Sequence, residues 1–311
     1  MRICVTTPVR DHHKTWLEEA AADRCELQFE ADLSADAVIG DCTPEEIRAF
    51  ENLRWFHLVW AGVDRYRKDD LAEGALFTNG SGAYGVTIAE HMMACMLSLY
   101  RQLRHYDRLQ KTHLWDGDWQ EDTLEGKTVL ILGAGDIGQA LAKRLQGFDC
   151  KVWGIRRQTG NLPCFDEMYT LKQLDELLPK ADVVACCLPG TAETRGLLDE
   201  KRLRAMKSTA LLINCGRGNL IDTKALEKVL LEGHLGGCGL DVTDPEPLPA
   251  DSPLWDLERV ILTPHISGAS FGHVAEMEDK IYRLAAENLR RYLDGKTLLN
   301  EVDFEIGYRM K

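Results

Sequence analysis

Residues 129–138 read Val-Leu-Ile-Leu-Gly-Ala-Gly-Asp-Ile-Gly, an apolar run that leads directly into a G-x-G-x-x-G motif. The apolar run predicts a buried strand, and the residues after the motif predict a helix, which is the context that makes such glycines informative. Gly133 allows a tight turn, Gly135 lets a pyrophosphate approach the backbone, and Gly138 permits close helix–strand packing. The N-terminus of the helix adds free N–H groups and partial positive charge. We therefore expect a dinucleotide site that uses Gly133, Gly135, Asp136, Ile137 and Gly138.

The end of the next expected strand bears on which dinucleotide binds. An Asp or Glu there would hydrogen-bond the 2′-hydroxyl of the adenine ribose, whereas this chain has Arg156 and Arg157. A guanidinium binds a 2′-phosphate by charge-assisted hydrogen bonds, and a carboxylate would repel it. The arginine pair therefore favours NADP(H). NAD(H) stays open as the alternative, because two adjacent arginines can also form a solvated basic turn.

Short β-branched runs alternate with helical patterns along nearly the whole chain, and this alternation predicts parallel sheets with helices on both faces. One series precedes a long amphipathic helix, and a second series begins at Gly126. We therefore expect an α/β protein with two parallel-sheet units. The expected strands are residues 3–6, 26–29, 37–40, 55–61, 127–132, 150–155, 181–188, 210–214, 237–242 and 260–263. The expected helices are one that opens at Pro44 and residues 15–22, 85–110, 136–146, 171–178, 199–206, 223–232 and 270–293.

Length and charge limit the class of protein. With 311 residues, the chain is long enough for two domains. Lys and Arg number 37 against 50 Asp and Glu, so the formal net charge is −13. This balance argues against nucleic acid and against an anionic membrane surface as partners. Glu90 and His91 interrupt the most apolar helical stretch, so we expect no membrane-spanning segment.

The ten cysteines include no C-x-x-C pair, and several lie in apolar runs, as Cys186 and Cys187 do. Such cysteines behave as small hydrophobic residues, so we expect reduced core thiols rather than a disulfide framework or a metal site. Eight charged residues among the first 25 positions argue against a signal peptide. Together these features favour a cytoplasmic protein.

Three later loops place a polar residue just beyond an expected strand: Arg217, Glu246 and His265. In an open α/β sheet the ligand lies beyond the carboxyl ends of the strands, so these loops can converge on one crevice. Taken singly, an arginine is usually solvated, a histidine is usually structural, and a glutamate between prolines is usually a surface turn. Taken together at the ends of three strands, they form a set suited to acid–base chemistry on an anionic substrate.

Over nearly its full length the sequence resembles the D-isomer-specific 2-hydroxyacid dehydrogenases. The resemblance rests on several motifs whose combination is far more specific than any one of them. They are the fingerprint at 133–138, Asn-x-x-Arg-Gly at 214–218, Asp-Val-x-x-x-Glu-Pro at 241–247, Thr-Pro-His at 263–265 and the tail Leu-Asn-Glu-Val-Asp at 299–303. The resemblance implies hydride transfer between a nicotinamide cofactor and a small 2-oxo or D-2-hydroxy acid.

The side-chain chemistry agrees with this implied reaction. His265 is suited to be the general acid, because its ordinary pKa lies near neutral pH. Glu246, if hydrogen-bonded to His265, would favour the imidazolium and raise its pKa. Arg217 can hold the substrate's carboxylate and carbonyl through two parallel donors and polarise the C=O bond. Asp241 is better placed to orient the cofactor or Arg217 than to exchange protons.

The resemblance implies further contacts in both halves of the chain. In the N-terminal half, small residues at 61 and 62 would let a carboxylate approach main-chain N–H groups. For Trp60 and Tyr84 the alternative is packing, because aromatic residues beside a strand often only pack. The implied substrate contacts are Trp60, Ala61, Gly62, Asn79 and Tyr84. The implied additional cofactor contacts are Leu188, Pro189, Thr194, Cys215, Gly216, Asp241 and Gly268.

By the same resemblance, both domains are Rossmann-like or flavodoxin-like, and the cofactor domain is inserted in a discontinuous substrate domain. Residues 1–91 and 277–311 would form the substrate domain, and residues 92–276 the dinucleotide-binding domain. Residues 101–119 resemble the arm that pairs two subunits in this family, which implies a homodimer. The alternative is an ordinary exposed loop. His91, on the long helix, is expected to be structural.

These observations favour an NADP(H)-linked reductase of a small 2-oxo acid, similar to glyoxylate/hydroxypyruvate reductases. A second interpretation keeps the fold but makes the protein an NAD-dependent dehydrogenase like phosphoglycerate dehydrogenases. The arginine pair and the expected lack of a C-terminal regulatory domain speak against it. A third interpretation is a dinucleotide-sensing binding protein like the corepressors that share this framework.

Overall fold

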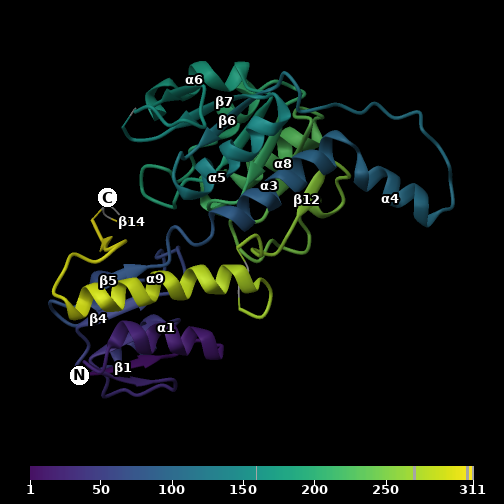
Figure 1. Cartoon of the computed structure of the whole chain (residues 1–311). Coiled ribbons are helices and arrows are strands. Elements are labelled where there is room, and N and C mark those ends of the chain that lie inside the picture. Colours follow the sequence, from purple (N-terminus) through teal and green to yellow (C-terminus); the bar gives the residue numbers. More distant parts are fainter. Residues whose placement is uncertain (159, 269–270, 306–307, 310–311) are drawn as a thin grey trace. The chain divides into compact units, whose positions relative to one another are not determined.

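The computed structural model describes all residues of the chain except 159, 269–270, 306–307 and 310–311 (Figure 1). The chain forms two compact units. Unit 1 combines Met1–Tyr84 with Ala269–Lys311, and unit 2 is the continuous segment Gly85–Gly268. The sequence analysis predicted domain boundaries after residues 91 and 276. These lie seven and eight residues beyond the observed boundaries, which follow Tyr84 and Gly268. The observed division assigns the whole of the helix that begins at Gly85 to unit 2.

Unit 1 is built on a five-stranded parallel sheet with the strand order β2-β1-β3-β4-β5, the order of flavodoxin-like folds. Its strands are β1 Arg2–Val5, β2 Glu26–Gln28, β3 Ala37–Gly40, β4 Trp55–Leu58 and β5 Leu76–Asn79, with β13 Val302–Asp303 and β14 Tyr308–Arg309 as an antiparallel pair. Its helices are α1 Asp11–Ala21, α2 Pro44–Arg48, α9 Ala275–Leu293 and the 3₁₀ turn η1 Lys68–Asp70. The sequence did not predict β5.

Apolar side chains cover both faces of this sheet. On one face, α1 and α9 lie side by side (Figure 1) and bury Leu17, Tyr282 and Leu289 against Ile3 and Trp55. The other face holds an aromatic cluster, in which the rings of Phe56 and Phe77 stack with centroids 5.2 Å apart. The returning C-terminal segment contributes α9 to this core, which explains why unit 1 needs both ends of the chain.

Unit 2 is built on a seven-stranded parallel sheet with the order β12-β11-β10-β9-β6-β7-β8. The order reverses between β6 and β9, as in a Rossmann fold. Its strands are β6 Thr128–Leu132, β7 Lys151–Ile155, β8 Glu167–Tyr169, β9 Val183–Cys186, β10 Leu211–Asn214, β11 Gly237–Leu240 and β12 Val260–Leu262. Its helices are α3 Gly85–Tyr100, α4 Leu103–Lys111, α5 Asp136–Leu145, α6 Leu174–Leu177, α7 Glu200–Ala205 and α8 Thr223–Leu231. Its 3₁₀ turns are η2 Gln146–Phe148, η3 Leu171–Gln173, η4 Leu178–Lys180, η5 Gly218–Leu220 and η6 Pro253–Trp255.

The expectation of one continuous helix over residues 85–110 is wrong. Gln102 adopts a left-handed conformation with φ of 52°, which ends α3 before α4 begins. The two helices also differ in environment: α3 is largely buried, whereas α4 buries only His105 among its side chains. Within the described part of the chain, no helix combines the length and apolar character needed to cross a membrane.

All ten cysteines are unpaired, and six of them are buried. Burial raises the pKa of Cys187 and of Cys238 to about 12, so both remain thiols near neutral pH. Cys186 and Cys238 belong to the apolar core of unit 2. They therefore act as small core residues, as the apolar runs around them predict.

His57, on β4, is fully buried in a small polar network of unit 1. Its Nδ1 lies 2.8 Å from Oγ1 of Thr78 and 3.4 Å from Nδ2 of Asn288. Its Nε2 has no hydrogen-bond partner within the residues that the structure describes. Burial lowers the pKa of His57 to about 3, so the folded protein holds a neutral imidazole.

We predict that this histidine makes unit 1 less stable in acid. Between pH 6.5 and 3 the unfolded chain binds a proton at His57 that the folded chain does not, so the free energy of unfolding falls as the pH falls. From pH 7 to pH 4 the loss is about 3 kcal/mol, at about 1.4 kcal/mol per pKa unit. Urea unfolding at several pH values will measure it. His57→Gln should flatten the slope, and His273→Gln, at an exposed site of unit 1, should not. Equal slopes for the wild type and His57→Gln would refute the prediction.

Candidate functional site

The dinucleotide motif forms the turn between β6 and α5 that the sequence predicted. Gly133 has φ of +108°, and a Cβ there would lie 2.9 Å from the carbonyl carbon and oxygen of Cys187. A Cβ on Gly138 would lie 2.1 Å from the carbonyl oxygen of Gly133. Both positions therefore require glycine, whereas a Cβ on Gly135 would meet no other atom within 4 Å. These features fit the pyrophosphate of a dinucleotide.

The basic turn after β7 holds Arg156 and Arg157. Arg156 is half-buried, and its backbone N–H donates to the carbonyl oxygen of Tyr169 (3.1 Å), which fixes the turn against β8. Arg157 is exposed. Among the described residues, no carboxylate forms an ion pair with either guanidinium, so both charges are available to an external anion.

Two more segments meet at the same edge of the sheet, after β9 and β10. A Cβ on Gly216 would lie 2.7 Å from the carbonyl oxygen of Leu188, so the two loops run in close contact. Cys215 is buried, and its backbone N–H donates to the carbonyl oxygen of Cys186 (3.2 Å). Thr194 is also buried, and its hydroxyl donates to the carbonyl oxygen of Pro189 (2.6 Å). These predicted cofactor contacts thus shape one loop pair, and their contact with a cofactor stays a prediction.

Arg217 lies in the loop after β10 and is the N-cap residue of the short turn η5. Asn214 holds this loop, since its amide donates to the carbonyl oxygen of Arg217 (3.0 Å) and its oxygen accepts from the N–H of Gly216 (3.0 Å). The guanidinium donates to the carbonyl oxygen of Gly216 (2.8 Å). A Cβ on Gly218 would lie 1.9 Å from the carbonyl oxygen of Thr243, so the loop packs tightly on the one after β11.

The structure brings Glu246 and His265 together from different loops. Nδ1 of His265 lies 2.8 Å from Oε1 of Glu246, within hydrogen-bond distance. Both side chains are exposed, by 50% for His265 and 40% for Glu246, so a substrate can reach the free side of the imidazole. A carboxylate on Nδ1 keeps a proton on that nitrogen and leaves Nε2 as the reactive atom.

Asp241 supports the turn that carries His265. Its buried carboxylate accepts four hydrogen bonds: from the Thr263 hydroxyl (2.7 Å), the Ile266 N–H (2.9 Å), and the N–H (3.0 Å) and hydroxyl of Ser267. Burial raises the pKa of Asp241, but the bonds from Ser267, Thr263 and Ile266 outweigh burial and lower it. The backbone N–H of His265 donates to the Asp241 carbonyl oxygen (2.8 Å). These hydrogen bonds hold the His265 turn, and the expected role of Asp241 in orienting the cofactor or Arg217 stays a prediction.

Sequence reasoning gave no role at this site to three residues of the network, Thr263, Ser267 and His91, and expected His91 to be structural. Nε2 of His91, on α3, lies 3.1 Å from the Thr263 hydroxyl. Thr263 is part of the Thr-Pro-His motif, but the motif does not predict the hydrogen-bond partners of the threonine. His91 is far from it in sequence, and a single histidine on a helix carries no signal of its own.

The predicted substrate residues lie together in unit 1, at the carboxyl ends of β4 and β5. Asn79 is buried and donates to the carbonyl oxygen of Ala61 (2.8 Å), and the Tyr84 hydroxyl donates to that of Val59 (2.8 Å). The carbonyl oxygen of Trp60 accepts from the N–H of Gly80 (2.9 Å). These bonds fix the turn at residues 60–62. The aromatic rings also pack, since Trp60 and Tyr84 have centroids 6.3 Å apart.

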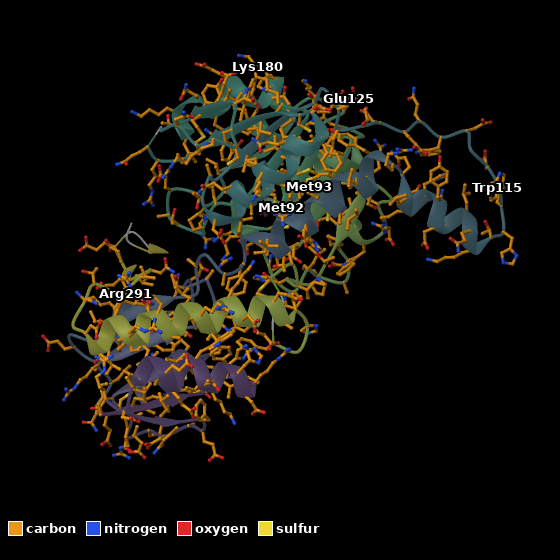
Figure 2. All side chains as sticks on the ribbon, viewed as in Figure 1. Met92, Met93, Trp115, Glu125, Lys180 and Arg291 are labelled. Carbon is orange, nitrogen blue, oxygen red and sulfur yellow. The ribbon has the colours of Figure 1, made fainter. Side chains whose placement is uncertain are left out.

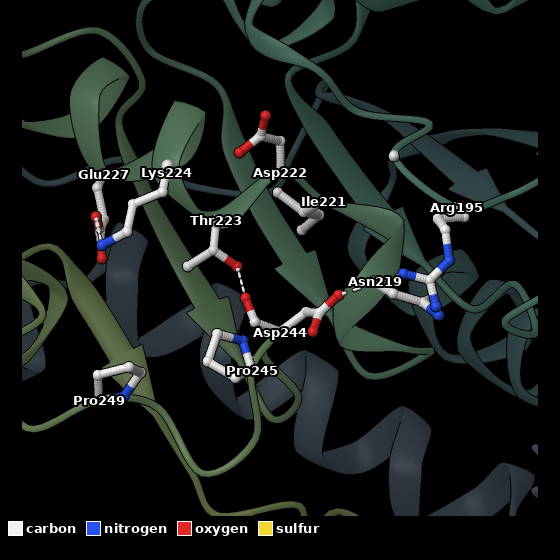
Figure 3. A pocket seen from close by; sticks show the side chains of 11 residues that line it. Arg195, Asn219, Ile221, Asp222, Thr223, Lys224, Glu227, Asp244, Pro245 and Pro249 are labelled. Carbon is white, nitrogen blue, oxygen red and sulfur yellow. Dashed lines mark hydrogen bonds and ion pairs between the residues drawn. The ribbon is translucent and has the colours of Figure 1, made fainter. Parts of the chain in front are cut away.

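Unit 2 also has a pocket of about 320 Å³ that none of the predicted site residues line (Figure 3). Arg195 and Asp244 flank it, and the Thr223 hydroxyl donates to the carbonyl oxygen of Asp244 (2.6 Å). Its walls mix both signs of charge, because Lys224 pairs with Glu227 (2.9 Å). The pocket therefore offers no clear preference for an anion or a cation.

His12, His13 and Asp279 place three candidate metal-binding atoms within 4.8 Å of one another in unit 1. Nε2 of each histidine lies 2.8–2.9 Å from the same carboxylate oxygen of Asp279. Nδ1 of His13 accepts from the backbone N–H of Arg10 (3.3 Å), so its Nε2 carries a proton and donates to Asp279. The cluster is therefore explained by hydrogen bonds that join α1 to α9.

Comparison with known proteins agrees with this geometry. Residues 93–267 match the family model "D-isomer specific 2-hydroxyacid dehydrogenase, NAD binding domain". The chain is 34% identical to a glyoxylate reductase from Thermofilum pendens over 84% of this chain and 76% of the relative. It is also 34% identical to a D-3-phosphoglycerate dehydrogenase from Mycobacterium leprae, over 85% of this chain but only 49% of that longer protein.

A solved structure extends the likeness to the fold of almost the entire chain. This structure is an NADPH-dependent glyoxylate/hydroxypyruvate reductase from Sinorhizobium meliloti in complex with NADP and sulfate. The two chains are 25% identical and superpose with a TM-score of 0.81 over 99% of each. The matched family model covers more than half of the chain, including the loops of Arg217, Glu246 and His265. The protein therefore belongs to the D-isomer specific 2-hydroxyacid dehydrogenases, oxidoreductases that act on a CH–OH group.

Proposed function

We propose that this protein is an NADPH-dependent reductase of a small 2-oxo acid of the glyoxylate or hydroxypyruvate type. The observation that carries the proposal is the 2.8 Å contact between His265 and Glu246 in the unit that also forms the dinucleotide turn. The reaction consumes the 2-oxo acid, NADPH and a proton, and forms the 2-hydroxy acid and NADP⁺.

In this reaction the chain must hold the substrate and supply one proton. When bound, the reduced nicotinamide supplies the hydride for C2. Arg217 binds the carboxylate and the carbonyl oxygen of the 2-oxo acid and polarises the C=O bond. His265 gives its Nε2 proton to the oxygen of C2 as negative charge develops there. Glu246 accepts from Nδ1–H of His265, which orients the ring and stabilises the protonated imidazole.

The preference for NADPH rests on the turn after β7. A 2′-phosphate needs positive charge at this position, and Arg156 and Arg157 offer two guanidinium groups that no described carboxylate neutralises. An NAD-specific site would hold a carboxylate there. The Sinorhizobium meliloti reductase described above, which is NADPH-dependent and holds NADP, supports the same choice.

The second candidate is an NAD-dependent dehydrogenase of the phosphoglycerate type. The Mycobacterium leprae relative favours it by name, although the chain spans about half of that protein. The arginine turn favours the first candidate. A non-catalytic dinucleotide sensor is the third candidate. The exposed His265–Glu246 pair favours an enzyme over such a sensor.

We further propose that residues 101–119 pair two copies of the chain into a homodimer. Leu103, Leu114 and Trp115 have exposed fractions of 54%, 55% and 104%. Trp119 stacks on His105 with ring centroids 4.0 Å apart and stays 46% exposed. Figure 2 shows Trp115 on the loop after α4, directed away from the rest of unit 2. Apolar side chains so fully exposed in one segment are typical of an interaction surface.

A substrate panel tests the proposed function directly. Glyoxylate, hydroxypyruvate and pyruvate are each offered with NADPH and with NADH, and 3-phosphoglycerate is offered with NAD⁺ and NADP⁺. We expect turnover of glyoxylate or hydroxypyruvate with kcat/KM at least tenfold higher for NADPH than for NADH. Faster turnover of 3-phosphoglycerate with NAD⁺ would support the second candidate. Nucleotide binding without any turnover would support the sensor.

His265→Ala should lower kcat by about 10²–10⁴, the usual loss when a general acid is removed. Glu246→Gln should lower kcat less, because a neutral amide still accepts from Nδ1–H but stabilises the imidazolium poorly. Steady-state kinetics with saturating nucleotide will measure both effects. Lys180→Ala, at an exposed site of unit 2 outside residues 101–119, is the control. A near-normal kcat for His265→Ala would remove the assignment of the acid.

Arg156→Ala and Arg157→Ala should raise KM for NADPH about tenfold or more and leave KM for NADH within twofold. The reason is that only NADPH carries the 2′-phosphate that these guanidinium groups would bind. Arg259→Ala, at an exposed site of the same unit, is the control for a general loss of positive charge. If KM rises equally for both nucleotides in both variants, the arginines do not select the cofactor.

Trp115→Ala combined with Leu114→Ser should shift the protein from dimer to monomer. The two substitutions remove exposed apolar area and change no residue of the sheet of unit 2. The melting temperature of the variant should therefore stay within a few degrees of the wild-type value. Light scattering after size-exclusion chromatography will give the mass of each species. A wild-type protein that elutes as a monomer at all concentrations contradicts the homodimer.

A further inference from the structure

A hydrogen-bonded chain leads from α3 to the turn of His265. Nε2 of His91 lies 3.1 Å from Oγ1 of Thr263, and the Thr263 hydroxyl donates to Oδ1 of Asp241 at 2.7 Å. Since the hydroxyl proton points to the carboxylate, the Thr263 oxygen accepts the hydrogen bond from His91. His91 therefore acts as a donor through Nε2–H, and the chain runs in one direction from His91 to Asp241.

Asp241 binds the His265 turn through residues that precede and follow His265 in the sequence. Its carboxylate accepts from Thr263 before the histidine and from Ile266 and Ser267 after it. His265 itself has φ of 55°, a left-handed conformation that costs free energy for a residue other than glycine. Its N–H donates to the carbonyl oxygens of Asp241 (2.8 Å) and Thr263 (3.0 Å). The position of the imidazole thus depends on contacts that surround it, because the local backbone preference opposes it.

The helix that carries His91 is itself anchored at the dinucleotide turn. A Cβ on Gly85, the first residue of α3, would lie 2.7 Å from both carboxylate oxygens of Asp136, at the start of α5. Five residues further along α3, Glu90 pairs with Arg144 of α5 at 2.8 Å. α3 therefore contacts the dinucleotide turn at its first residue and the His265 turn through His91.

We propose that His91 is a positioning residue: by donating to Thr263, it fixes the orientation of the Thr263 hydroxyl and thereby the Asp241-bound turn that presents His265. His91 does not touch the substrate or exchange protons with it. The proposal rests on the proposed role of His265 as the acid. It also explains why a helix that packs against α5 carries a histidine facing the loop after β12.

Two pairs of variants separate this role from simple packing. His91→Leu removes the donor, whereas His91→Gln keeps an N–H donor on a side chain of similar reach. Thr263→Val removes the hydroxyl at nearly constant volume, whereas Thr263→Ser keeps it. We expect His91→Leu and Thr263→Val each to lower kcat about 10- to 100-fold, with KM for the nucleotide within about threefold. His91→Gln and Thr263→Ser should recover most of kcat.

The double variant His91→Leu/Thr263→Val tests whether His91 acts through Thr263. If it does, the double variant is no slower than Thr263→Val alone, because the second change removes a bond that no longer matters. Multiplied effects on kcat would show that the two residues act separately and would overturn the proposal. Ala94→Gln, at an exposed site of α3, is the control and should leave kcat unchanged.

A second measurement does not depend on turnover. The ¹H–¹³C signal of the His265 ring at ε1, assigned with the His265→Ala variant, should shift in His91→Leu and in Thr263→Val but not in Ala94→Gln. The same signal of His57 in unit 1 should stay in place in all variants. If the wild type turns over none of the panel acids, the proposed function fails while this measurement still decides the coupling. An unmoved His265 signal in His91→Leu overturns the positioning role.

Discussion

The candidate site depends on one buried carboxylate, that of Asp241. A carboxylate removed from water without partners costs several kcal/mol, so a buried one is stable only where donors surround it. Here the donors are the N–H groups of Ile266 and Ser267 and the hydroxyls of Thr263 and Ser267. Any movement of the His265 turn would break hydrogen bonds to the Asp241 carboxylate. The cost of leaving the charge unpaired therefore holds His265 in a left-handed conformation that its own backbone does not favour.

The parallel sheet explains why this carboxylate lies where it does. Asp241 is the first residue after β11, and its N–H donates to the carbonyl oxygen of Asn214 at the end of β10 (3.0 Å). Thr263 follows β12 directly, and its N–H donates to the carbonyl oxygen of Leu240 (3.0 Å). The ladder of hydrogen bonds in the sheet thus continues into the loops by one residue. Strand register, and not loop chemistry alone, places the carboxylate beside its donors.

The sequence predicts those parts of the site that local geometry determines. The β6–Gly133–α5 turn could be read directly, because the strand, the glycines and the helix are consecutive and each restricts the backbone. The sequence predicted that the loops of Glu246 and His265 can converge, and the structure adds that these loops follow the paired strands β11 and β12. Their chemical roles rest on the family and on the variants that test them.

Long-range and subtle backbone features escaped prediction. The apolar pattern of residues 85–110 continues through Gln102, which has a left-handed conformation. Because Gln102 is not a glycine or proline, its residue type does not predict the end of α3 at this point. β5 reads Leu-Phe-Thr-Asn and β8 reads Glu-Met-Tyr, so neither strand contains an apolar run of three or more residues. His91 reaches Thr263 across 172 positions of sequence. Only the fold defines such a pair, because each residue alone has an ordinary structural explanation.

The division of the chain separates two tasks that the reaction combines. The dinucleotide turn, the basic turn and the His265–Glu246 pair all belong to the continuous unit Gly85–Gly268. The sheet of this unit therefore sets the position of His265, the proposed proton donor, relative to the dinucleotide turn. The residues proposed to recognise the substrate, such as Asn79 and Tyr84, belong to unit 1 and are held there by bonds within that unit. A change of the residues proposed to recognise the substrate thus leaves the His265–Glu246 pair and Asp241 intact, which would allow the proposed reduction to serve different 2-oxo acids.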